Sequence, residues 1–305
     1  MGSEPGPAIV LDAVVKRFGS LTAVDGLDLV VPRGIVLGLL GPNGAGKSTT
    51  MRMLTGQALC DSGTIEVLGL PVPKESKRIR ALMGVVPQQD NLDTELTARQ
   101  NLEMFAVLYR VARRERKAAI DRALELAQLT ERADAKVTEL SGGMRRRLLI
   151  ARGLVHDPEL VLLDEPTVGL DPQVRQDLWS LIDGLRSEGK TVLMSTHYIE
   201  EAERLADDVA VVSRGKVVAQ GSPAALLHTH VGEHAIEYYG SPHRVTEIEQ
   251  RAHEAGLPTR RTGPSVSVLG SEKAEPDLLA ELGDGVQRAA NLEDVFVLLT
   301  GEVLE

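Results

Sequence analysis

Short apolar runs, each bounded by polar or glycine-containing segments, recur through the first 220 residues of the chain. The runs at 35–40, 160–163 and 191–195 are almost wholly apolar, which is typical of strands covered on both faces of a parallel sheet. Other runs predict further strands, at 8–15, 25–31, 63–68 and 84–86, and a closing hairpin at 208–213 and 216–220. Strands that alternate with helical segments predict an α/β fold.

Helical periodicity fills the segments between these strands. Apolar residues three or four apart predict helices at 48–59, 97–128, 148–154 and 173–186, while residues 74–80 predict a short polar helix or a loop. The block 97–128, in which Leu102, Phe105 and Leu108 follow this spacing, is long and stands between two strands. We therefore expect a helical subdomain at about 95–155, inserted into the α/β domain.

The charge balance changes near residue 230. Residues 231–305 hold 14 acidic and 6 basic side chains, a net charge of −8, whereas the whole chain carries −10 and the first 230 residues therefore only −2. Weaker patterns after this point predict strands at 235–239, 258–261 and 265–269 and helices at 244–255, 275–282 and 292–299. We expect one domain at 8–230 and a small α+β accessory module at 231–305.

Composition limits the possible partners and compartments. An acidic chain lacks the broad basic surface that nucleic-acid binding requires, so we expect no nucleic-acid partner. The single Cys60 cannot form an internal disulfide, and the N-terminal residues lack the basic start and apolar core of a secretory signal. No apolar run approaches the roughly 18 residues of a membrane span. The expected location is cytoplasmic.

A phosphate-binding loop follows the strand at 35–40. The stretch fits the pattern G-x-x-x-x-G-K-[ST], and its residues are Gly41, Pro42, Asn43, Gly44, Ala45, Gly46, Lys47, Ser48 and Thr49. Glycines let successive backbone N–H groups surround a phosphate, Lys47 would reach the β- and γ-phosphates, and the Ser48 hydroxyl would bind Mg²⁺. A glycine-rich turn without function would not need Lys-Ser after its last glycine. The loop predicts a P-loop nucleotide triphosphatase that uses Mg²⁺.

Polar residues stand at the ends of two later strands. Asp164 and Glu165 end the run 160–163, and His197 follows the run 191–195. The carboxyl ends of parallel strands are where α/β sheets bind ligands. Asp164 is therefore expected to hold the Mg²⁺ shell, Glu165 to polarise the attacking water, and His197 to contact the γ-phosphate.

A second glycine-containing turn precedes the helical run 148–154. It contains Ser141, Gly142, Gly143 and Met144, followed by three arginines. Ser141 could simply be a helix N-cap. Glycines in a first helical turn cost roughly 1 kcal/mol each relative to alanine, so we expect them to serve a close approach of an anion to the backbone.

Taken in order, the phosphate loop, Pro87-Gln88, Leu140-Ser141-Gly142-Gly143, the Asp164-Glu165 pair and His197 resemble the nucleotide-binding subunit of ATP-binding cassette (ABC) transporters over about residues 8–230. The resemblance implies a RecA-like core with an N-terminal antiparallel β part and an α-helical subdomain. It further implies that Phe18 stacks on adenine, that Gln88 senses Mg²⁺ and the membrane partner, and that Asp171 lies in a dimer loop. Ser141, Gly142 and Gly143 would form the signature that closes on ATP held by a second subunit.

One position departs from the family pattern, because Met144 stands where the signature usually has glutamine. The sequence Ser-Gly-Gly-Met-Arg-Arg-Arg, the segment Pro87–Leu92 and the ending Asn291–Phe296 resemble the branch of exporters related to daunorubicin-resistance and nodulation-factor systems. That resemblance implies an ABC-2 type permease as the membrane partner, a homodimer of ATPase subunits, and a location on the inner face of the cell membrane. The alternatives are a soluble ABC-type ATPase of DNA repair or translation, and a regulatory module that binds ATP without hydrolysing it.

Overall fold

A six-stranded sheet forms the centre of the molecule in the computed structural model, which describes residues 6–302. Its strand order is β10-β9-β3-β8-β7-β6, and every strand is parallel to its neighbours except β10. The bounds are β3 Val36–Leu40, β6 Met83–Val86, β7 Leu160–Asp164, β8 Thr191–Thr196, β9 Asp208–Ser213 and β10 Lys216–Gly221. All residues of β3 and β8 are buried. The predicted α/β fold with a parallel sheet is confirmed.

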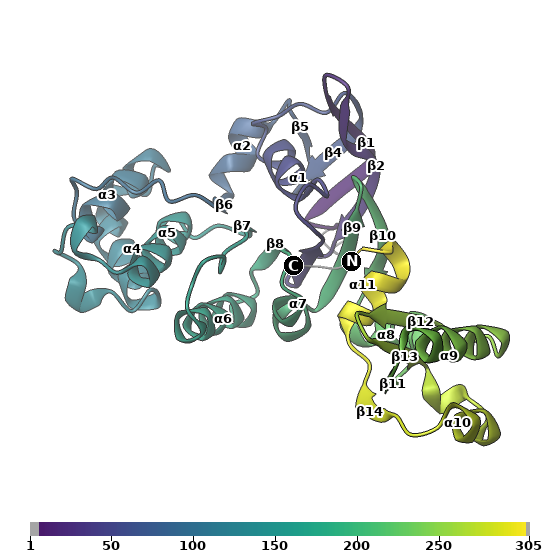
Figure 1. Cartoon of the computed structure of the whole chain (residues 1–305). Coiled ribbons are helices and arrows are strands. Elements are labelled where there is room, and N and C mark those ends of the chain that lie inside the picture. Colours follow the sequence, from purple (N-terminus) through teal and green to yellow (C-terminus); the bar gives the residue numbers. More distant parts are fainter. Residues whose placement is uncertain (1–5, 303–305) are drawn as a thin grey trace, which may run out of the picture.

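A second, antiparallel sheet lies beside the centre, in the order β2-β1-β4-β5. Its strands are β1 Ile9–Phe18, β2 Leu21–Val31, β4 Ser62–Val67 and β5 Leu70–Val72. Side chains of this sheet such as Leu27 share one buried cluster with Leu39 of β3 and with Met53 of helix α1 (Lys47–Leu54). The N-terminal antiparallel part is thus packed on the central sheet through α1 (Figure 1).

The predicted helix at 48–59 is wrong at its C-terminal end, because α1 stops at Leu54. Gly56 adopts a φ of +69°, and a Cβ at this position would lie 2.5 Å from Ser76 Oγ. A backbone in the left-handed region ends a helix, and glycine is the residue that tolerates it. The chain therefore turns away after α1 toward β4.

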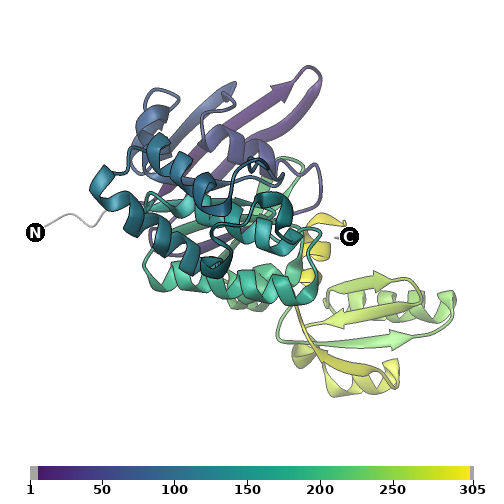
Figure 2. The ribbon, with the colours of Figure 1, turned by 90° about the vertical axis from the view of Figure 1, so that its left-hand side faces the viewer.

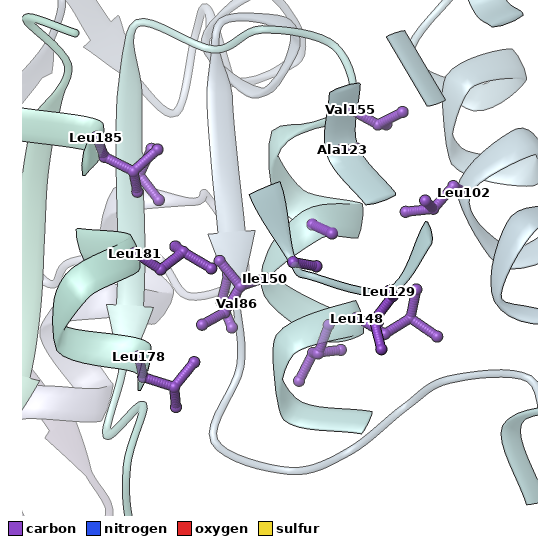
Figure 3. Packing of buried hydrophobic residues seen from close by; sticks show 14 of the residues in the cluster. Val86, Leu102, Ala123, Leu129, Leu148, Ile150, Val155, Leu178, Leu181 and Leu185 are labelled. Carbon is purple, nitrogen blue, oxygen red and sulfur yellow. The ribbon is translucent and has the colours of Figure 1, made fainter. Parts of the chain in front are cut away.

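The helical subdomain contains α3 Ala98–Leu108, α4 Arg113–Leu126 and α5 Gly142–Leu154, with two short 3-10 helices at Thr130–Arg132 and Val137–Glu139. The helical pattern predicted over 97–128 corresponds to two helices, α3 and α4, because the chain turns at Arg110, whose φ is +59°. These helices lie at one side of the central sheet in Figure 1. Figure 3 shows Val86, Ile150 and Leu181 approaching one another from β6, α5 and α6. The subdomain and the sheet therefore share one core.

Four further helices complete the part of the chain up to residue 230. They are α2 Ser76–Ala81, α6 Pro172–Ser187, α7 Ile199–Leu205 and α8 Pro223–His230. Helix α6 corresponds to the helix predicted at 173–186, and α2 to the short helix or loop at 74–80. The sequence patterns did not predict α7 or α8. Among the residues that the structure describes, no helix has both the length and the apolarity needed to cross a membrane.

A third sheet, antiparallel in the order β12-β13-β11-β14, belongs to the C-terminal residues (Figure 2). Its elements are β11 His234–Tyr239, α9 Pro242–Glu254, β12 Thr259–Thr262, β13 Ser265–Leu269, α10 Pro276–Leu282 and β14 Val286–Ala289. Helix α11 (Leu292–Thr300) returns to the central part, where Phe296 is buried in one cluster with Leu40 and Val211. The expected C-terminal α+β arrangement is confirmed, and α11 attaches it to the core. Residues 1–5, which carry most of the N-terminal stretch considered above, and 303–305 lie outside the described residues.

Candidate functional site

The phosphate loop connects the end of β3 to the start of α1, as the motif requires. A Cβ on Gly41 would lie 2.2 Å from the carbonyl oxygen of Val212, and a Cβ on Gly46, whose φ is +105°, would lie 2.5 Å from Ala23 O. Gly44 has a φ of +83° and open space where a side chain would stand. Only glycine fits at positions 41 and 46, and the open concavity at Gly44 leaves backbone N–H groups accessible to a phosphate.

Lys47, the first residue of α1, is buried at the centre of this loop. Its Nζ donates hydrogen bonds to Gly41 O at 2.7 Å and to Pro42 O at 3.0 Å, and it lies 3.4 Å from Glu165 Oε1. Burial lowers the pKa of the Lys47 ammonium, while the charges of Glu165 and Asp164 act in the opposite direction. The loop thus presents a buried cation beside two carboxylates.

Asp164 meets two hydroxyl groups at the end of β7. Its Oδ1 accepts from Ser195 Oγ at 2.6 Å and from Ser48 Oγ at 3.2 Å. A carboxylate and a hydroxyl held this close form an all-oxygen donor set, which suits Mg²⁺ together with phosphate oxygens. The residues present therefore fit the magnesium ion that the sequence predicts.

Glu165 is buried and is contacted by each of the other predicted catalytic or switch residues. Its Oε2 accepts from Gln88 Nε2 at 2.8 Å, and its Oε1 lies 3.3 Å from His197 Nδ1. The backbone of Glu165 has a φ of +46°, uncommon for a residue other than glycine, and its N–H donates to Ser195 Oγ at 3.0 Å. Strained backbone of this kind is often found at functional sites.

A cavity of about 260 Å³ joins these groups to an aromatic side chain. The cavity lining includes these site residues that the sequence predicts: Phe18, Asn43, Gly44, Gly46, Lys47, Ser48, Thr49, Gln88 and Glu165. The Phe18 side chain at the end of β1 is half exposed, as a ring must be if a flat ligand is to stack on it. The structure therefore brings the nucleotide-binding, switch and catalytic candidates of one chain to one place.

The signature residues do not line this cavity. Ser141 caps α5 by accepting from Met144 N at 3.2 Å, and Asp171 caps α6 by accepting from Val174 N at 3.0 Å. A Cβ on Gly143 would lie 2.6 Å from Val174 Cγ1, so close packing of α5 on α6 is enough to require this glycine. Gly142 has open space around it. Helix packing alone therefore explains why residue 143 is glycine, and the anion contact expected for both glycines is not required to explain Gly143.

The sequence patterns did not single out two residues that lie near Glu165. Ser195 pairs in register with Asp164 across β7 and β8, and its place at the end of a strand was a usable signal. Arg146 contacts the backbone on both sides of the site. It is one of three consecutive arginines, and nothing in the sequence distinguishes it from its neighbours.

Known proteins are similar to this chain over the residues of the site. A family model described as ABC transporter matches residues 24–168. The chain is 43% identical to the Nod factor export ATP-binding protein I of Rhizobium meliloti (strain 1021), over 100% of this chain and 91% of that protein. It is 44% identical to the protein of the same name from Paraburkholderia xenovorans (strain LB400), over 99% of each. This chain belongs to the ABC transporter family.

As a family member it is an ATP-binding, ATP-hydrolysing subunit of an ABC exporter. A solved dimeric ATP-binding cassette, in a post-hydrolysis state with ADP and Pi, matches with a TM-score of 0.63 and 28% identity, over 70% of this chain and 98% of that one. The predicted family, P-loop fold, ATP binding and ATPase activity are thereby confirmed.

Proposed function

We propose that two copies of this chain hydrolyse ATP on the inner face of the cell membrane and drive export through a separate ABC-2 type permease. The observation that carries the proposal is that one chain holds only half of the predicted site. Phe18, the phosphate loop, Gln88 and Glu165 share a cavity, whereas Ser141 and Gly142 lie exposed at the start of α5. A second copy would supply these signature groups.

The roles of the cavity residues follow from their chemistry. Phosphoryl transfer to water depends mainly on positioning and on charge neutralisation. Glu165 would accept the proton of the attacking water, and Lys47 would bind the β- and γ-phosphates. His197 and Gln88, which both contact the Glu165 carboxylate, would orient it toward the γ-phosphate. Bound Mg²⁺, held by Ser48, Asp164 and the Gln88 switch, would neutralise charge on the phosphate oxygens.

The closing of two copies would complete each site. Gly142 has open space and Ser141 is exposed, so both can approach a nucleotide held by the other chain. Asp171 at the start of α6 is also exposed, as a residue of a dimer loop would be. We take residues 8–230 as the nucleotide-binding domain and 231–305 as an accessory module, a division supported by the separate sheet of the latter.

An apolar face of α3 supports contact with the permease. Met104, Val107 and Leu108 lie on one side of this helix and are 43%, 49% and 67% exposed. Beside Leu108, a groove of about 700 Å³ is lined by Arg110 and by the basic residues of α2, including Arg78. Exposed apolar side chains next to a charged groove are typical of a protein interface. The groove fits a cytoplasmic permease segment that carries apolar and acidic residues.

Helix α2 connects this surface to the ATP site. It leads directly into β6, which ends at Val86 immediately before Pro87 and Gln88. A movement of the permease segment against α2 and α3 would therefore reach Gln88 and, through its hydrogen bond, Glu165. This route would couple hydrolysis to transport.

Co-purification from the source cells tests the proposal. Tagged chain would be isolated in mild detergent and its partners identified by mass spectrometry. We expect an ABC-2 type permease in near-equal amount, lost with Leu108→Arg and kept with Val218→Arg, since Val218 is also an exposed apolar residue but lies on β10. Recovery of ribosomes, DNA-repair proteins or no partner would overturn the export role and leave the ATPase chemistry intact.

A further inference from the structure

Arg146 lies on α5, the helix that begins with the signature, and its guanidinium reaches the backbone of two segments that carry residues of the ATP site. All of its hydrogen bonds in the described structure go to backbone carbonyl oxygens. Nε donates to Pro166 at 2.6 Å, Nη1 to Pro87 at 2.8 Å and Gln88 at 3.0 Å, and Nη2 to Glu165 at 3.0 Å and Asp164 at 3.3 Å. A guanidinium has five N–H donors, so each donor has a carbonyl partner.

These carbonyl groups belong to two separate loops. Residues 87–88 follow β6 and residues 164–166 comprise the last residue of β7 and the two residues after it, and the two strands are neighbours in the central sheet. The side chains of Gln88 and Glu165, which belong to the same two loops, are joined by their 2.8 Å hydrogen bond. Arg146 therefore connects, through the backbone, the same two loops that Gln88 and Glu165 connect through their side chains.

The Glu165 peptide has a particular need for such support. Its φ of +46° lies in the left-handed region, which an unsupported glutamate rarely adopts. Its N–H is held by Ser195 Oγ, and its carbonyl is held by Arg146 Nη2. Loss of the second contact would leave the peptide free to relax and the carboxylate free to turn away.

We propose that Arg146 is a positioning residue for ATP hydrolysis, which fixes Gln88 and Glu165 relative to each other through the backbone of both loops. Because Arg146 stands on α5, it also ties their geometry to the helix that carries the signature. This inference rests on the proposed role of Glu165 and is independent of the permease.

No shorter or less branched side chain can replace these contacts. Lysine has three N–H donors and glutamine two, so neither can supply the five carbonyl contacts that the guanidinium makes. The other arginines of α5 do not share the arrangement. Arg147 donates to Gln128 Oε1 at 2.7 Å and Arg152 to Asn91 O at 2.9 Å, while Arg145 lies 3.8 Å from Asp90. Arg145 is therefore a matched control on the same helix.

The test compares Arg146→Gln, Arg146→Lys and the control Arg145→Gln in the full chain, with Glu165→Gln as reference. Arginine, lysine and glutamine have similar helix propensities, so α5 itself should persist. We expect Arg146→Gln to lower the kcat for ATP by about 100-fold, the effect of a misplaced catalytic group. KM and the Kd for a fluorescent ATP analogue should change less than about threefold. The kcat of Arg146→Lys should lie between those of Arg146→Gln and the parent, and the kcat of Arg145→Gln should match that of the parent.

Hydrogen exchange separates positioning from general stability. Peptides covering the residues around 88 and around 165 should exchange faster together in Arg146→Gln and remain unchanged in Arg145→Gln. A kcat within about twofold of the parent, or faster exchange in only one of the two loops, would overturn the inference. If Glu165→Gln hydrolyses ATP normally, the role of Glu165 fails instead, so the two failures are distinguishable.

Discussion

The amide nitrogen of Gln88 donates a hydrogen bond of 2.8 Å to the carboxylate of Glu165. The two residues are 77 positions apart in the chain and meet because β6 and β7 are parallel neighbours that end at the same edge of the sheet. The amide directly contacts the proposed general base. A change at Gln88 can therefore alter the orientation of Glu165 without any change in the phosphate loop.

Gly143→Ala is expected to destabilise the chain by about 1–3 kcal/mol, the usual cost of overpacking. The added methyl group would lie 2.6 Å from Val174 Cγ1, between α5 and α6. In urea denaturation, Val174→Ala should remove most of this cost in the double variant. Gly142→Ala is the control, because its methyl group would meet no atom within 4 Å. Equal effects of the two alanines would contradict the packing argument.

His156 is expected to lower the free energy of unfolding in mild acid. It stacks on Tyr109 with 3.9 Å between ring centroids and bonds Met83 O, and burial lowers its pKa to about 4. The unfolded chain, with a histidine pKa near 6.5, binds a proton first, so stability falls as the pH drops from about 6.5 toward 4. The loss between pH 7 and pH 5 should be about 2 kcal/mol.

His156→Phe keeps the aromatic stack and removes the titrating group. Its denaturation midpoint should therefore fall less steeply between pH 7 and pH 5 than that of the parent chain. His228→Phe, a change at an exposed histidine of α8, should leave the slope as it is. An unchanged slope in His156→Phe would show that other groups cause the acid sensitivity.

Asp294→Ala is expected to lower the free energy of unfolding by about 3–5 kcal/mol, the usual effect of breaking a buried ion pair. Asp294 of α11 is fully buried and accepts from Arg260 at 2.9 Å and from Arg288 at 2.7 Å. Burial acts to raise the pKa of Asp294, but hydrogen bonds from the two arginines lower it overall. Glu293→Ala, which removes a partly exposed partner of Arg260, should cost clearly less in the same urea experiment. A smaller effect at Asp294 than at Glu293 would contradict this assignment.

The phosphate loop could be predicted because its geometry is contained in nine consecutive residues. The buried strands could be predicted because a parallel sheet covered on both faces demands a continuous apolar run. The break at Arg110 could not be predicted, since residues 108–113 contain neither glycine nor proline to mark a turn. Helix α8 was not predicted, although Ser222 and Pro223 provide a usable start signal for it.

Long-range relationships were beyond the sequence patterns. The predicted helix at 292–299 exists as α11, but the burial of Phe296 against Leu40 depends on how two distant segments fold together. The same is true of Arg146, whose carbonyl partners lie up to 59 positions away. A pattern of residue types identifies groups that carry chemistry, whereas groups that support the backbone become visible only in three dimensions.

The central claim is that Glu165 activates water in a site that a second copy completes. Glu165→Gln should bind ATP, lose at least about 100-fold of the turnover, and form a stable dimer with ATP and Mg²⁺ in sedimentation velocity. Adding Ser141→Arg should abolish that dimer while each chain still binds ATP. Normal hydrolysis by Glu165→Gln, or a variant that binds ATP and stays monomeric, would contradict the account.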